Sequence, residues 1–250
     1  MFKSTYNTQH GTSTLGHAIA SGNPVYVKQL LNDLPQKDVL EVSRLGRTFL
    51  HTASDLGDVK MVRLLLGRGI DVNAVDSGKW TALHFAADAG SQRICKLLID
   101  DGADVNAKTE DCNWTPLHLS ASKGHAKLVS QLLEFGADVN ALTSDKWTPL
   151  LLASNAGHYA TCKYLIGANA DINCTDPTEM ETALHKACRN GHEKIAKLLI
   201  ENGSRMTLDR LGLSPVCHAI ACNFGWKISI ECADPVEGEK VDDQKEDALH

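Results

Sequence analysis

Residues 113–141 read NWTPLHLSASKGHAKLVSQLLEFGADVNA. Two other stretches repeat most of these words: WTALHFAADAGSQRICKLLIDDGADVNA at 80–107 and WTPLLLASNAGHYATCKYLIGANADINC at 147–174. In each copy a threonine follows the tryptophan, a glycine stands in the middle, and an Ala-Asp dipeptide begins the last few residues. The chain is therefore built from one repeated unit, and the length of that unit decides the fold.

The unit is 33 or 34 residues long, and three independent series of markers keep this period over five units. The series are the opening threonines Thr48, Thr81, Thr115, Thr148 and Thr182, the mid-unit glycines Gly57, Gly90, Gly124, Gly157 and Gly191, and the closing residues Gly69, Gly102, Gly136, Asn169 and Gly203. Weaker copies begin at Ser13 and Leu213. The sequence predicts about seven units, of which the last is incomplete.

Each unit is predicted to hold two helices followed by a hairpin. Thr115 is a helix N-cap, because its hydroxyl can accept a hydrogen bond from an unpaired backbone N–H. Pro116 suits the first helical position, where a missing N–H costs nothing. Gly124 and Gly136 end the two helices, where a left-handed backbone is needed. Since one unit cannot bury its own apolar face, the units must stack into a solenoid.

A period near 33 with Thr-Pro-Leu-His words resembles the ankyrin-repeat family over residues 13–232. The resemblance implies an all-α solenoid of stacked helix-turn-helix units with β-hairpin tips, in which the hairpins and the first helices line a concave side. It leaves residues 1–12 as an N-terminal extension and 233–250 as an acidic tail. It also implies that the chain binds another protein, either as an adaptor or scaffold or as a dedicated chaperone or regulatory subunit of one complex.

Composition argues against several other classes. The net charge is −6, whereas a protein that binds nucleic-acid backbones is expected to be basic. No run of about 18 apolar residues predicts a membrane span, and the first residues lack the apolar core of a secretory signal. We therefore expect a monomer with a protein partner, no nucleic acid and no membrane, in the cytoplasm or the nucleus.

The histidines and cysteines follow the repeat register, which favours structural roles over catalytic ones. His51, His84, His118 and His185 stand three residues after the threonine, and His125, His158 and His192 follow the mid-unit glycine. The family resemblance implies that the first series makes hydrogen bonds around the threonine. Cys95 and Cys162 occupy equivalent places in second helices and are expected in the core.

No catalytic residue, metal site or cofactor is predicted. The chain contains no phosphate-binding loop, nucleophile elbow or zinc-protease motif. Cys217, Cys222 and Cys232 lie near His218, but their spacing matches no common ligand pattern. An enzyme whose site lies in the irregular last unit remains the alternative.

Three tryptophans mark the candidate binding surface. Trp80, Trp114 and Trp147 stand directly before the threonine in three successive units, so the stack should arrange them as a ladder. Tryptophan is common among the residues that dominate binding energy. The alternative is that each ring only shelters the stem of its hairpin, as happens in this family.

Charged and polar residues extend this surface. The flanking units carry Arg47 and Glu181 in place of tryptophan. The resemblance also places the two residues before each mid-unit glycine on the concave side. The candidate partner-binding residues at those places are Asp88, Lys123, Asn155 and Arg189. Charge there changes from acidic in the early units to basic in the later ones, which would orient a helix or an extended peptide of the partner.

Two further features belong to the hairpins and the end of the chain. Asn106 and Asn140 lie in Asp-Val-Asn-Ala words, where the family resemblance implies possible hydroxylation by an asparaginyl hydroxylase; the alternative is an unmodified turn residue. Residues 224–232 alternate with period two instead of the helical period, so the last unit is either truncated or an irregular cap. The tail 233–250 has a net charge of −5 and is predicted to be disordered.

Overall fold

A computed structural model describes residues 15, 18–19, 24–33 and 42–222. Within these ranges all the regular structure is helical. The helices are α2 Pro24–Asp33, α4 Phe49–Asp55, α5 Val59–Leu66, α6 Ala82–Asp88, α7 Gln92–Asp100, α8 Pro116–Lys123, α9 Ala126–Glu134, α10 Pro149–Ala156, α11 Tyr159–Gly167, α12 Ala183–Arg189, α13 Glu193–Glu201 and α14 Pro215–Ala221. Five units contribute a helix pair each, and α2 and α14 belong to the flanking units. The all-α solenoid is confirmed.

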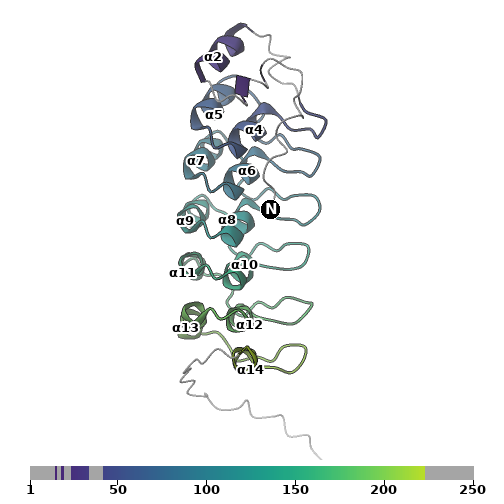
Figure 1. Cartoon of the computed structure of the whole chain (residues 1–250), viewed down its shortest axis with the longest axis vertical. Helices are drawn as coiled ribbons and strands as arrows, with labels where there is room; N and C mark the ends of the chain where they lie inside the picture. The colour runs from purple at the N-terminus through teal and green to yellow at the C-terminus, as the bar shows by residue number, and fades with distance from the viewer. Residues whose placement is uncertain (1–14, 16–17, 20–23, 34–41, 223–250) are drawn as a thin grey trace, which may run out of the picture.

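The helices stand in two parallel columns, with the hairpin loops as a third column beside them (Figure 1). The first helix of each unit forms the inner column, α4, α6, α8, α10, α12 and α14, and lies between the outer helices and the loops. From α4 to α12, each inner helix packs on the inner helix of the next unit and on the outer helix of its own unit. We call the side of the stack formed by the inner helices and the hairpin loops the groove face.

The helix boundaries follow the predicted local signals. Thr115 Oγ1 accepts the N–H of His118 at the start of α8, and proline occupies the first turn of α8, α10 and α14. Gly124 ends α8 in the left-handed region at φ +75°. Asn169, which replaces glycine at the end of a second helix, is left-handed at φ +61°. These predictions are confirmed.

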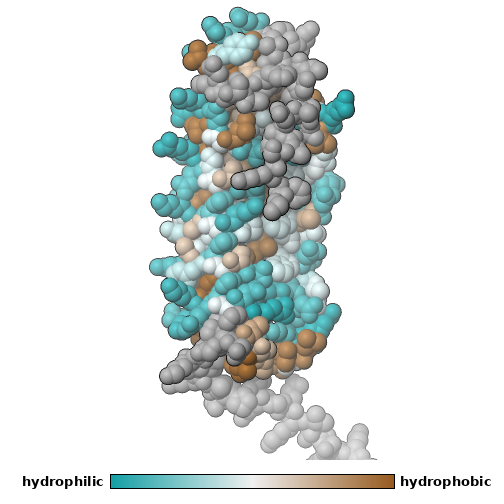
Figure 2. Space-filling view, viewed as in Figure 1, coloured by the Kyte–Doolittle hydropathy of each residue, from teal (hydrophilic) through white to brown (hydrophobic). Residues whose placement is uncertain are grey.

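The core runs without interruption along the stack, because each unit buries its apolar face against both neighbours. Alanines such as Ala86 and Ala121 allow the inner helices to approach closely, and leucines such as Leu98 and Leu132 fill the space beneath the outer helices. Cys95 and Cys162 are fully buried, as predicted. In the view of Figure 2, polar residues cover most of the stack, and apolar residues gather at the end near α14.

Backbone hydrogen bonds close the hairpin loops, and the described residues form isolated β-bridges but no longer strand. In the central unit the N–H of Thr109 donates to the carbonyl of Trp114 at 3.0 Å. Isolated bridges join Val42 to Thr48 and Thr175 to Thr182. The predicted hairpin tips are therefore tight turns, too short for a ladder of strand bonds.

Several predictions concern residues outside the described ranges: the extension 1–12, most of the first unit, the alternating segment 224–232 and the acidic tail 233–250. They stay predictions.

Candidate binding surface

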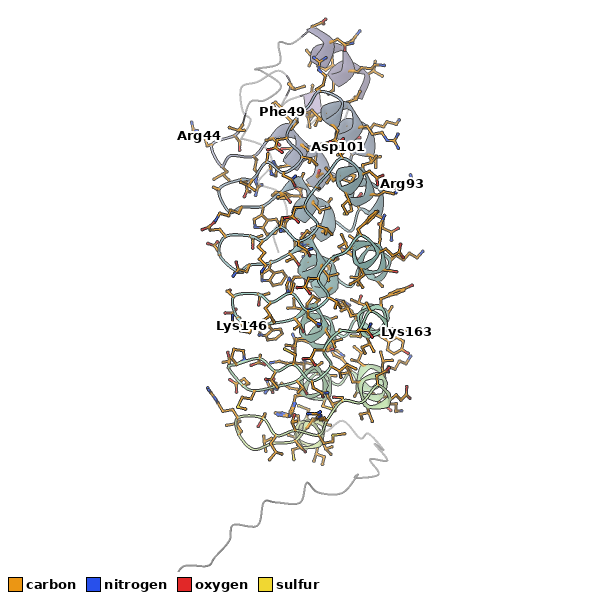
Figure 3. All side chains as sticks on the ribbon, turned by 180° about the vertical axis from the view of Figure 1, so that it is seen from behind. Arg44, Phe49, Arg93, Asp101, Lys146 and Lys163 are labelled. Atoms are coloured by element: carbon orange, nitrogen blue, oxygen red, sulfur yellow. The ribbon has the colours of Figure 1, made fainter. Side chains whose placement is uncertain are left out.

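The groove face and the outer helices lie on opposite sides of the stack. Figure 3 shows the side chains of Arg44 and Lys146 on the hairpin loops at one edge, and those of Arg93 and Lys163 on the outer helices at the other. Residues that stand at the base of the hairpins lie between these edges, against the inner helices. The three tryptophans belong to that central strip.

A buried polar side chain closes the base of each hairpin, which the sequence analysis did not single out. Thr109 Oγ1 accepts the N–H of Trp114 at 3.0 Å, while its own N–H bonds the tryptophan carbonyl. Equivalent buried residues in the other hairpins are Ser43, Asp76, Thr143, Asp176 and Asp209. Both backbone groups of Trp114 are thereby fixed, so the position of its ring is preorganised. A serine, threonine or aspartate at this place in each unit was the missed sequence signal.

The first histidine series links each unit to the next. His118 Nδ1 accepts the N–H of Thr115 at 3.1 Å, and its Nε2 lies 3.0 Å from the carbonyl of Ala141 and 3.2 Å from that of Trp147. A carbonyl can only accept, so Nε2 carries the proton and the ring is neutral. Equivalent bonds are made by His51, His84 and His185. The predicted structural role of this series is confirmed.

Burial keeps these rings neutral. A charged imidazolium would lose its hydration in the core. Because of this cost, burial lowers the pKa of His84 and of His118 to about 4. The pKa values of His51 and His185 are lowered for the same reason. A ring held in one neutral tautomer between two backbone partners is a structural link and is poorly placed for proton transfer.

The second histidine series joins consecutive units through the mid-unit glycines, a role that the sequence analysis missed. His158 Nε2 lies 3.0 Å from the carbonyl of Ser122 in the preceding unit. A Cβ added to Gly124 would come within 2.5 Å of the same ring. The other two pairs of this kind are Gly90 with His125 and Gly157 with His192. The glycine is needed both for its left-handed backbone and for the space it leaves.

Trp80 and Trp114 are half-buried, with one side against the core and the other on the groove face. The Trp80 ring centroid lies 5.2 Å from that of Phe85, and the Trp114 centroid lies 6.2 Å from that of His118. Each ring therefore shelters a hairpin stem and also presents surface to solvent. The two interpretations of the tryptophans are both compatible with this geometry.

Trp147 is half-buried like the other two, but a cation lies against its ring. Lys186 Nζ lies 4.5 Å from the centroid of the Trp147 ring, and Lys186 is itself buried. Arg47 occupies the repeat position of the tryptophans, and Phe85 occupies the repeat position of Lys186. At this other end of the tryptophan series, the Arg47 guanidinium lies 4.7 Å from the centroid of the Phe85 ring. Arg47 also pairs with Asp76 at 3.2 Å. At both ends of the tryptophan series, a cation–π contact therefore joins side chains of neighbouring units.

Glu181 does not belong to the exposed surface, and the prediction that it contacts a partner was wrong. Its side chain is 0% exposed. The carboxylate pairs with Lys186 at 2.6 Å, with Arg189, and with His218 at 3.7 Å. A carboxylate in this interior needs such partners, because burying an unpaired charge is costly. Sequence position alone did not reveal that two cations from α12 and the ring of His218 from α14 converge on it.

The polar residues before the mid-unit glycines are exposed or half-buried, as predicted. Asp88 pairs with Lys123 at 3.5 Å, and the Asn190 amide donates to Asn155 Oδ1 at 3.0 Å. Asp55, one unit earlier, has no cation at an equivalent place. Burial and the charge of Asp88 raise the pKa of Asp55 to about 6. At the acidic end of the predicted charge gradient, the carboxylate of Asp55 is therefore less compensated by a nearby cation than that of Asp88.

Asn106 and Asn140 bridge consecutive hairpins. Asn106 Nδ2 donates to the carbonyl of Gly136 at 3.1 Å, and its Oδ1 accepts the N–H of Asp138 at 2.8 Å. Asn140 Oδ1 accepts the N–H of Asp171 at 2.8 Å. Both asparagines are exposed at the loop edge. Their hydroxylation stays a prediction.

The cysteines offer little reactivity in the core. Burial raises the pKa of Cys95 to about 12 and that of Cys162 to about 11, so both remain thiols. Cys217 and Cys222 are exposed, whereas His218 is buried and contacts Asp209 and Glu181 instead. Cys232 lies outside the described ranges. Among the described residues, the group with metal-ligand potential is Glu181, Asp209 and His218.

None of the helices in the described ranges combines the length and the hydropathy that a membrane span requires.

Comparison with known families agrees with the geometry. The family model for ankyrin repeats in three copies matches residues 15–109, 107–176 and 168–234. None of the curated proteins compared with the chain matches it. Ankyrin repeats generally act as protein–protein interaction modules, and the family is typically non-catalytic. The stacked helix pairs, the hairpin loops and the matched residues together show that this chain belongs to the ankyrin-repeat family.

Proposed function

We propose that this protein is an adaptor or scaffold that holds a helix or an extended peptide of a partner protein on its groove face, with Trp114 at the centre of the interface. The partner is sought in the cytoplasm or the nucleus. Binding needs no chemical step, because recognition comes from a surface that already has its bound shape.

One observation carries this proposal. Trp80 and Trp114 lie in adjacent units, keep one side exposed, and have both backbone groups hydrogen-bonded at the hairpin base. A large ring with few rotatable bonds loses little entropy on contact, and a fixed backbone reduces that loss further. The Asp88–Lys123 pair, at the C-terminal ends of α6 and α8, supplies polar groups to the same groove face.

The experiment starts with capture of a partner from cytosolic and nuclear extracts, followed by measurement of affinity with purified components. Trp114→Ala is expected to weaken binding by about 30-fold or more, which corresponds to roughly 2 kcal/mol. Trp147→Ala is the comparison variant, because Lys186 contacts this ring and the loss of that internal contact should chiefly lower stability. Lys163→Ala, on the outer helices, should leave binding unchanged.

Urea unfolding of each variant supplies the folded fraction by which affinities are corrected. Unchanged corrected affinity in both Trp80→Ala and Trp114→Ala would move the interface away from the tryptophan strip. One stoichiometric complex would favour a dedicated subunit of a single assembly, and several weaker partners would favour a general adaptor.

A further inference from the structure

A buried cluster of charged residues lies where α14 meets α12. Asp209 Oδ2 lies 2.7 Å from His218 Nε2, and Glu181 lies 3.7 Å from the same nitrogen. Lys186 pairs with Glu181 at 2.6 Å and with Asp176 at 2.9 Å. Arg189 completes the cluster by pairing with Glu181 and is its one substantially exposed member, at 39%.

The charges in this cluster do not balance without His218. The carboxylates of Asp176, Glu181 and Asp209 carry three negative charges, whereas Lys186 and Arg189 carry two positive charges. A neutral His218 leaves one buried negative charge uncompensated. A protonated His218 brings the sum to zero. Because the interior screens charge poorly, this difference affects how firmly the surrounding elements hold together.

Each hairpin-base aspartate pairs with a basic side chain, and at the last one that side chain is a histidine. Asp76 is paired with the guanidinium of Arg47 and Asp176 with the ammonium of Lys186. Asp209 is paired with His218, which stands in the repeat position of Lys186. Histidine is the side chain that ordinarily changes charge between pH 5 and 8. The other described hairpins use serine or threonine at this place and need no cation.

We propose that protonation of His218 fastens the last described helix, α14, to the rest of the stack, so that the terminal repeat is held firmly near pH 6 and is loosened near pH 8. The Nε2 proton is donated to Asp209 in both states. The second proton comes from solvent and binds Nδ1, which creates the imidazolium that offsets the third carboxylate.

The surroundings of His218 support this direction. The hairpin loops contribute Asp176, Glu181 and Asp209, and α12 contributes the cations Lys186 and Arg189. The ring of His185 from α12 meets His218 edge-on with centroids 5.8 Å apart. His185 Nδ1 accepts the N–H of Thr182 and its Nε2 faces the Leu213 carbonyl, so the ring is held in a neutral tautomer, and burial lowers its pKa. The two cations, Lys186 and Arg189, oppose the binding of a metal ion by Glu181, Asp209 and His218.

Hydrogen exchange of the full-length chain at pH 6 and pH 8, corrected for intrinsic exchange rates, tests the proposal. Protection of the α14 amides is expected to fall by about tenfold or more at pH 8, because the buried carboxylates then lose the positive charge that offsets the third of them. Protection of α8 should stay constant, because its buried His118, with a pKa of about 4, remains neutral throughout. The central units therefore provide an internal control.

Two variants separate the charge from the shape. His218→Lys supplies a permanent cation and should keep α14 protected at both pH values. His218→Gln keeps a hydrogen-bond donor without a charge and should show low protection at both. Nuclear magnetic resonance of the ring nitrogens in the parent chain should show His218 changing protonation between pH 6 and pH 8.

Equal protection of α14 at both pH values in the parent chain would overturn the proposal, as would pH dependence that persists in His218→Gln. A ring that stays neutral throughout would also overturn it. Zn²⁺ that restores protection at pH 8 in stoichiometric amounts would replace it with a metal site.

Discussion

Replacing Gly124 with alanine separates the two demands that the fold makes on a mid-unit glycine. Gly124 and Gly136 are both left-handed, at φ +75° and φ +87°. A Cβ on Gly136 would meet nothing within 4 Å, whereas one on Gly124 would lie 2.5 Å from the His158 ring. Gly136→Ala is therefore a matched control that tests backbone strain alone.

The backbone strain is expected to cost about 1 kcal/mol in each variant. Gly124→Ala must also displace the His158 ring, which would break its 3.0 Å hydrogen bond to the Ser122 carbonyl and add about 1–2 kcal/mol. We expect a total loss of about 2–3 kcal/mol in the free energy of unfolding for Gly124→Ala.

Urea unfolding followed by circular dichroism measures both costs. A third variant, Gly124→Ala with His158→Ala, should cost less than the sum of its two single changes, because the ring that clashes has been removed. Equal destabilisation by Gly124→Ala and Gly136→Ala, or strict additivity in the double variant, would refute the idea that glycine makes room for the histidine of the next unit.

Two further predictions concern pH. The low pKa values of His84 and His118 mean that the unfolded chain binds more protons than the folded chain between about pH 6.5 and pH 4. Stability is therefore complete above pH 6.5 and should fall by about 2–3 kcal/mol per histidine as the pH drops to 4, which urea titrations at several pH values would measure. A pH-independent midpoint over this range would contradict the neutral-ring assignment. Asp55 has a raised pKa, so its charge weakens the folded state as the pH rises from about 4 to 6. Asp55→Asn should raise the melting temperature at pH 7 by an amount equivalent to less than about 1 kcal/mol after solvent screening, and it should change little at pH 4; a lower melting temperature at pH 7 would oppose this.

Local signals made most of the fold predictable from the sequence. The threonine caps, the prolines at first helical positions and the left-handed Gly124 and Asn169 each act within one helical turn, so residue type alone reveals them. Because equivalent residues recur in each unit, the repeat register also predicted the place of a whole series of residues at once. It placed Cys95 and Cys162 in the core, and with the family resemblance it gave the first histidine series its structural role.

Contacts between units were decided by the tertiary structure. Lys186 covers Trp147 from 39 residues further along the chain, and His158 fills the space above Gly124 from 34 residues away. Residue type at one position cannot show which side chain of the next unit will reach it, because that depends on the stacking of two units. For this reason Glu181, expected on the surface from its place in the repeat, lies fully buried among cations from α12 and beside His218.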